Sequence, residues 1–201
     1  MNKEKTETRS IMLAGVGGQG TILAAKVLSE GLKQMDFDVK MSEIHGMSQR
    51  GGSVTSHVRF GTKVFSPVIP EGAADAVCGF EKLEALRYIS WLKPEGLIIV
   101  NDLETYPLPV LIGAAQYPAG ILESIRNLRE RCLIIPAHRM ALDLGTSRVE
   151  NIILLGALTA SLSLDDHPWE DTIRDLVKPN FVDINLRAFE AGRTYAVKES
   201  I

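Results

Sequence analysis

The N-terminal part of the chain combines a short apolar run with one amphipathic segment. Residues 10–15 are largely apolar, which is typical of a buried strand. In residues 21–35 the apolar side chains recur at steps of three and four, as on one face of a helix: Ile22, Leu23, Val27, Leu28, Leu32 and Met35. Between them stands GVGGQG, with four glycines in six positions. The pattern predicts strand, glycine turn and helix, the start of a Rossmann-like unit.

The next segment departs from the doubly wound pattern. Residues 38–44 read as a second strand, but the polar loop HGMSQRGG follows in place of a crossover helix. Residues 53–60 then alternate their faces as a strand does. Gly61 and Thr62 separate this run from KVFSPVI, as a Gly-X pair does in a two-residue hairpin. We therefore predict antiparallel strands, with an inserted β-hairpin, in the middle of the fold.

The rest of the chain returns to strands and helices and ends in helices. Apolar runs at residues 74–80, 96–102 and 132–137 predict buried strands, with helices at 81–92 and 119–130. The intervening residues 106–119 are rich in proline, and we predict irregular chain with a short strand at PVLIGA. The last third reads as helical. The predicted fold class is α/β: a Rossmann-like mixed sheet with flanking helices, an inserted β-hairpin and a helical C-terminal third.

Composition favours one globular domain in a reducing compartment. The 201 residues carry 45% hydrophobic and 23% charged side chains, and we predict a disordered tail at 1–9 and a single α/β domain at 10–201. The net charge of −3 argues against nucleic acid as a partner. The apolar run from Ile152 is shorter than the ~20 residues of a membrane span, and the charged N-terminus does not resemble a secretory signal. Two cysteines in apolar runs favour a cytoplasmic protein.

The glycine cluster is the first candidate site. Gly15, Gly17 and Gly20 satisfy G-x-G-x-x-G, which permits a pyrophosphate to approach the N-terminus of the following helix. Glu43 lies near the position of the acidic residue that holds a ribose in dinucleotide sites. Three interpretations stay open: NAD or FAD binding, another phosphate-bearing ligand, or a structural turn. A P-loop is excluded, because Thr21 follows Gly20 without the lysine that reaches the phosphates.

The second candidate is SEIHGMSQRGGS, residues 42–53. Ser48 lies near His45, but the G-x-S-x-G elbow of a hydrolase is absent. Glu43 and His45 alone are too few for a metal site. We therefore assign no catalytic residue and no metal ligand. Such a loop either is solvated or, as its arginine, glutamine and glycines favour, contacts a partner or ligand.

Four collinear segments resemble a known family: GVGGQGTILAAKVL, SEIHGMSQRGGSVTSHVRFG, VFSPVIPEGAADAVCGFEKLEALRY and NIILLGAL. Over about residues 11–158 they look like the gamma-type subunit or domain of the 2-oxoacid:ferredoxin oxidoreductases. EIHGMSQRGGSV is most similar to the beta subunits of indolepyruvate ferredoxin oxidoreductases.

This resemblance implies a complex that oxidatively decarboxylates an aryl 2-oxoacid on thiamine diphosphate and Mg²⁺. Electrons then pass through [4Fe–4S] clusters to ferredoxin, and an acyl-CoA is released. Four thiolates hold such a cluster and this chain has two cysteines, while the G-D-G stretch of the family's thiamine site is absent. The resemblance therefore implies a larger alpha subunit that carries these cofactors and reaches ferredoxin, and a non-catalytic role for this chain. When isolated, the chain is a candidate homodimer.

The candidate residues fall into two groups. The candidate cofactor-binding residues, for CoA or another phosphate-bearing group, are Gly15, Gly17, Gly18, Gln19, Gly20 and Thr21. The segment expected to face the partner's active site contains Glu43, His45, Gly46, Gln49, Arg50, Gly51 and Gly52, with Arg50 suited to a two-pronged contact with phosphate or carboxylate. Two alternative functions stay open: a free-standing Rossmann-type oxidoreductase that uses NAD or FAD, and a CoA- or anion-binding module.

Overall fold

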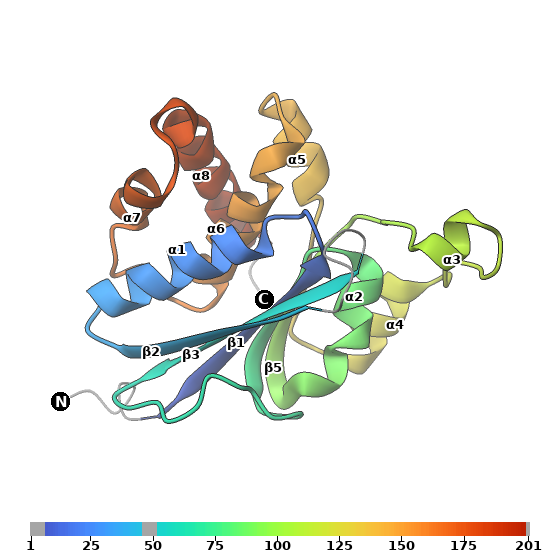
Figure 1. The fold of residues 1–201 in the computed structure, drawn as a ribbon, viewed down its shortest axis with the longest axis horizontal. Helices are drawn as coiled ribbons and strands as arrows, with labels where there is room; N and C mark the ends of the chain where they lie inside the picture. Colours follow the sequence, from blue (N-terminus) through green and yellow to red (C-terminus); the bar gives the residue numbers. More distant parts are fainter. Residues whose placement is uncertain (1–6, 46–51, 200–201) are drawn as a thin grey trace.

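The computed structural model describes residues 7–45 and 52–199, and nothing is described of the His45 side chain. In this part of the chain six strands form one sheet, in the order β2-β3-β1-β4-β5-β6 (Figure 1). The strands are β1 (Arg9–Val16), β2 (Asp38–His45), β3 (Ser53–Gly61), β4 (Ala74–Gly79), β5 (Leu92–Asn101) and β6 (Cys132–Ile135). The α-helices are α1 (Thr21–Gln34), α2 (Lys82–Arg87), α3 (Leu108–Leu111), α4 (Ile121–Leu128), α5 (Ala137–Asp143), α6 (Glu150–Ser161), α7 (Trp169–Leu176) and α8 (Val182–Lys198), with 3₁₀ turns at η2 (Ile89–Trp91), η3 (Ser147–Val149) and η4 (Pro179–Phe181).

One strand reverses the direction of an otherwise parallel sheet. β3 pairs antiparallel with β1 on one side and with β2 on the other, while β1, β4, β5 and β6 pair in parallel. Since β3 is antiparallel to both neighbours, β2 runs in the same direction as β1. The carboxyl ends of β1, β2, β4, β5 and β6 therefore lie at one edge of the sheet. The predicted mixed sheet with flanking helices is confirmed.

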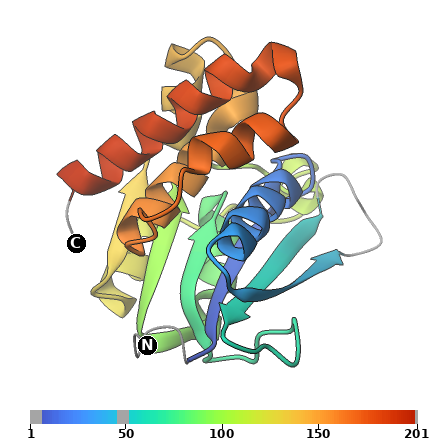
Figure 2. The same cartoon turned by 90° about the vertical axis from the view of Figure 1, so that its left-hand side faces the viewer.

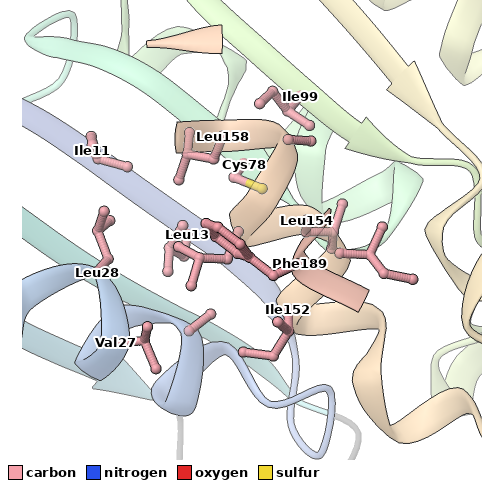
Figure 3. Packing of buried hydrophobic residues seen from close by; sticks show 14 of the residues in the cluster. Ile11, Leu13, Val27, Leu28, Cys78, Ile99, Ile152, Leu154, Leu158 and Phe189 are labelled. Atoms are coloured by element: carbon pink, nitrogen blue, oxygen red, sulfur yellow. The ribbon is translucent and has the colours of Figure 1, made fainter. Parts of the chain in front are cut away.

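Helices cover the sheet unequally (Figures 1 and 2). α1 and α5–α8 pack on one face, where Ile11 and Leu13 of β1 join the larger core cluster (Figure 3). Met12 faces the other side and joins a smaller cluster with residues of α2 and α4. Consecutive residues of β1 thus serve opposite faces, as the two-residue period of a strand requires.

The most apolar helix lies in the middle of the thicker layer. All residues of α6 from 150 to 159 are buried, because the helix packs between the sheet and α8. Where α6 and α8 meet, a Cβ on Gly156 would overlap the carbonyl oxygen of Phe189, and a Cβ on Gly192 would overlap that of Ile153. Glycine at both positions lets the two backbones come into direct contact. The predicted helical C-terminal third is confirmed.

The predicted hairpin at Gly61 and Thr62 is wrong. Residues 62–73 contain no strand, and the antiparallel partner of β3 is β2 instead. Pro67 and Pro70 cannot donate to a strand ladder, and Ile69 of this loop is buried in the smaller core cluster. The loop therefore covers part of the second face of the sheet.

The predicted short strand at PVLIGA is also wrong. Residues 108–111 form the single-turn helix α3 (Leu108–Leu111), which follows Pro107. Proline is favoured at the start of a helix because its missing N–H would have no partner there.

The first strand begins within the predicted tail. β1 begins at Arg9, inside the predicted tail 1–9, and residues 1–6 lie outside the described part. No helix in residues 7–45 or 52–199 is long and apolar enough to cross a membrane.

We expect Gly192→Ala to destabilise the protein by about 2 kcal/mol or more, because the added methyl group overpacks the contact between α8 and α6. Helix propensity alone would instead raise the stability by about 1 kcal/mol. The sign of the change in stability therefore shows whether overpacking or helix propensity dominates. Urea denaturation measures it. Glu190→Ala, at an exposed position on the same helix, is the control and should stay within about 0.5 kcal/mol of the wild type.

Candidate functional site

The glycine turn is closed by a glutamine that the turn itself supplies. Gln19 Oε1 accepts a hydrogen bond from the Val16 backbone N–H at 2.7 Å, and Gln19 Nε2 donates to the Phe80 carbonyl oxygen at 3.2 Å. Its side chain thus joins the end of β1 to the residue that follows β4. A Cβ on Gly15 would lie 2.8 Å from Gln19 Oε1, so glycine is needed at Gly15 for this arrangement. Gln19 therefore has a structural role inside the chain.

Two of the glycines adopt left-handed backbone conformations. Gly18 has φ 106° and Gly20 has φ 77°. Gly20 directly precedes α1, and its carbonyl oxygen accepts a hydrogen bond from Asn151 Nδ2 of α6 at 3.2 Å. A Cβ on Gly20 would lie 2.6 Å from that nitrogen, whereas one on Gly18 would meet nothing within 4 Å. The turn is packed against α6 at Gly20 and is open at Gly18.

The N-terminus of α1 lacks acidic and capping side chains. Gly20 provides no side-chain cap, and the first turn contains no acidic residue. The first N–H groups of a helix have no partner within the helix, and the helix dipole adds positive potential there. This end of α1 is therefore suited to a phosphate or carboxylate group.

A pocket of about 460 Å³ opens beside this helix end, lined by Gly17, Gly18, Gly20, Thr21, Ile22, Glu43 and Val54. Glu43 reaches it from β2 because β2 and β1 end at the same edge of the sheet. The pocket thus has a helix N-terminus on one side and a carboxylate on another. A ligand with an anionic group and hydroxyl or amino donors matches this pairing better than a simple anion does.

The two predicted loops meet through the backbone. The Gly17 N–H donates to the Gly52 carbonyl oxygen at 2.9 Å. Among the other residues of the second loop, His45 ends β2, and Gly46, Gln49, Arg50 and Gly51 lie outside the described residues. The assignment of this loop to the partner's active site stays a prediction.

Sequence reasoning missed the buried amides behind the glycine turn. Asn151 is 3% exposed, and its Oδ1 has no hydrogen-bond partner within the described chain. Asn101 is fully buried, donates through Nδ2 to the Phe80 carbonyl oxygen at 3.2 Å, and accepts from the His138 backbone N–H at 3.3 Å through Oδ1. The available signal was an asparagine next to each of two apolar runs, with Asn101 after one and Asn151 before the other, since a buried polar group must find a partner.

A buried carboxylate, also missed, organises the neighbouring part of the edge. Glu81 is 1% exposed and accepts hydrogen bonds from the Glu84 N–H at 2.9 Å, the Thr105 N–H at 3.2 Å and the Tyr117 hydroxyl. Burial and this carboxylate raise the pKa of Tyr117, which therefore stays protonated as the donor. Glu81 is a structural group because its partners lie within the chain.

The described residues provide no metal or redox centre. No group of three or more His, Cys, Asp or Glu side chains is placed to hold a metal ion within residues 7–45 and 52–199. Cys78 is buried in the larger core cluster, whereas Cys132 packs against the smaller one on the other face of the sheet. Burial raises the pKa of both thiols, so neither is activated as a nucleophile.

Comparison of the sequence with known proteins identifies a family and its relatives. Residues 10–195 match the family model described as pyruvate ferredoxin/flavodoxin oxidoreductase. The indolepyruvate oxidoreductase subunit IorB of Pyrococcus horikoshii is 39% identical over 96% of this chain and 97% of its own length.

Two solved structures share the fold. The gamma subunit of a keto/oxoacid ferredoxin oxidoreductase from Geobacter sulfurreducens PCA superposes with a TM-score of 0.71 at 24% identity, over 94% of this chain and 99% of that chain. A chain of 2-oxoglutarate:ferredoxin oxidoreductase from Magnetococcus marinus gives a TM-score of 0.73 at 16% identity, over 96% of this chain and 32% of that chain.

We expect Gly20→Ala to cost more stability than Gly120→Ala. Both glycines precede helices with similar left-handed conformations, φ 77° and 69°, but only Gly20 has Asn151 in its way. Gly120→Ala should lower the stability by about 1 kcal/mol because of the left-handed backbone conformation. Gly20→Ala should lower it by more, because the added Cβ also overlaps the Asn151 amide. Urea denaturation measures both.

A double-mutant cycle identifies the cause of the difference. Asn151→Ala removes the overlapping amide, so the effect of Gly20→Ala should fall toward that of Gly120→Ala in the Asn151→Ala background. Additive effects would show that the amide does not constrain the turn.

Proposed function

This chain belongs to the pyruvate ferredoxin/flavodoxin oxidoreductase family, and we propose that it is the non-catalytic subunit of a 2-oxoacid:ferredoxin oxidoreductase that acts on indolepyruvate or other aryl pyruvates. The observation that carries this proposal is the end-to-end match, at 39% identity, with a relative named as an indolepyruvate oxidoreductase subunit. A match that covers nearly all of both chains relates this chain to the whole subunit.

The chemistry is assigned to a larger partner. Thiamine diphosphate, when bound, supplies the carbanion chemistry of decarboxylation, and [4Fe–4S] clusters carry the electrons to ferredoxin. This chain has two cysteines in total, and they lie on opposite faces of the sheet, so it cannot supply the four thiolates of a cluster. We place these cofactors, Mg²⁺ and the ferredoxin contact on the larger subunit. The free cysteines support the proposed cytoplasmic location.

For this chain we propose two tasks at the carboxyl edge of the sheet. The loop from His45 to Gly52 would face the partner's active site, with Arg50 as its charged group. The glycine turn, from Gly15 to Thr21, would hold a phosphate-bearing part of CoA. The fit of the glycine turn rests on the uncapped N-terminus of α1 and the open face of Gly18. Glu43 in the same pocket suits the donors of such a ligand.

The order of the strands makes a free-standing NAD or FAD enzyme the weaker alternative. In a dinucleotide-binding unit the second strand carries the ribose-binding acid and lies next to the first. Here β3 separates β2 from β1, so Glu43 is two strands away from the glycine turn. The glycine turn and Glu43 still line the same pocket, so CoA and other anions stay candidates for its ligand.

Reconstitution tests the proposal. We expect reduction of ferredoxin by indolepyruvate and CoA only when this chain and the larger subunit are purified as a complex. Each chain assayed alone provides the control. Turnover by this chain alone, or full activity of the larger subunit without it, would contradict the proposed role.

A further inference from the structure

We propose that the projection around α3 is the surface that docks this chain onto the larger subunit of its complex, an inference that rests on the proposed function. The α3 projection, residues 105–112, extends beyond the rest of the described chain at the carboxyl edge of the sheet (Figure 1). Four large side chains are exposed along it: Tyr106 by 49%, Leu108 by 68%, Leu111 by 67% and Ile112 by 68%. Large apolar side chains that gather on one exposed segment are typical of an interaction surface.

The projection carries no charge. Residues 105–122 contain no Asp, Glu, Lys or Arg, although these make up 23% of the whole chain. A surface of this kind can be buried without the cost of desolvating ions. It therefore matches a partner surface that is itself apolar and uncharged, and it does not match nucleic acid or an ionic ligand.

A hollow beside the projection can receive a partner side chain. It has a volume of about 480 Å³ and lies between the end of β1, the start of α2 and the projection, with Val16, Gly52, Leu83, Leu108 and Leu111 in its walls. Three charged residues also contribute to its lining, and each has a partner within the chain: Glu81 accepts from the Glu84 N–H, and Glu84 accepts from Ser53 Oγ and from Arg87 Nε at 3.2 Å. The hollow thus suits an aliphatic or aromatic side chain.

The base of the projection is fixed before any partner arrives. Glu81 accepts hydrogen bonds from the Thr105 N–H and the Tyr117 hydroxyl, one on each side of α3. Lys82 pairs with Asp102 at 2.7 Å and with Glu104 at 3.2 Å. A surface held in this way loses little conformational entropy on binding.

The position of the hollow favours the larger subunit over a second copy of this chain. Gly52 in its walls ends the loop that we propose to face the partner's active site, and Val16 lies in the glycine turn, which the Gly17–Gly52 hydrogen bond joins to that loop. A chain that covers these loops therefore also reaches the hollow. A symmetric contact through α3 would instead place a second copy beside the same edge and hinder access to it.

The test compares exposed leucines inside and outside the projection. Leu108→Ser with Leu111→Ser removes the centre of the projection, and Leu142→Ser removes a leucine of α5 that is 53% exposed elsewhere. The wild type and the two variants are each co-expressed with the larger subunit to test whether the complex forms. The affinity of each for the larger subunit is then measured with separately purified chains. We expect roughly 100-fold weaker binding for the double variant and wild-type binding for Leu142→Ser. Unchanged thermal denaturation of the isolated variants shows that they fold.

Two results overturn the inference while the proposed function stands. One is wild-type affinity of the double variant for the larger subunit. The other is that the isolated wild-type chain forms a dimer, the double variant is a monomer, and the double variant still binds the larger subunit as the wild type does. That result would assign the projection to contact with a second copy. Failure of the wild-type chain itself to bind the larger subunit would overturn the proposed function, and this inference with it.

Discussion

The burial of α6 on every side determines where the site's polar groups lie. A helix without a polar face must be enclosed, and α6 is enclosed by the sheet on one side and by the α8 backbone on the other, at Gly156 and Gly192. This packing fixes the first residues of α6 at the carboxyl edge of the sheet. There Asn151 contacts the Gly20 carbonyl oxygen across 131 positions of sequence. The conformation of the glycine turn thus depends on a helix that contributes no residue to the lining of the pocket.

The polar groups of this edge are mostly committed to one another. Gln19 and Asn101 both donate to the Phe80 carbonyl oxygen, and Glu81 receives two backbone N–H groups and a hydroxyl. What faces the pocket here is a helix N-terminus and Glu43. These contacts make the described part of the edge a rigid support for the glycine turn.

The sequence predicts what local periodicity controls and fails where distant segments compete. The strands around Ile11 and Cys78, and helix α1, follow from patterns confined to a few residues. The Gly61–Thr62 pair has the sequence of a hairpin turn. Tertiary contacts prevail over it, because β3 pairs with β2 and Ile69 is buried in the smaller core cluster. Asn151 and Glu81 were missed for the same reason: their partners, Gly20 and Tyr117, lie far away in sequence. The glycine turn itself was recognised because G-x-G-x-x-G is a local motif.

A separate chain and a domain of a longer chain face different physical demands. In the Magnetococcus marinus protein the matching fold occupies 32% of one chain, so the covalent connection keeps it near its neighbours at a high effective concentration. The IorB subunit of Pyrococcus horikoshii is matched over 97% of its own length, and a subunit without such a connection stays bound through its surface alone. The leucines exposed on the rigidly based α3 projection fit that requirement under the proposed docking. The cost of exposing them in the free chain is recovered only when a second surface covers them.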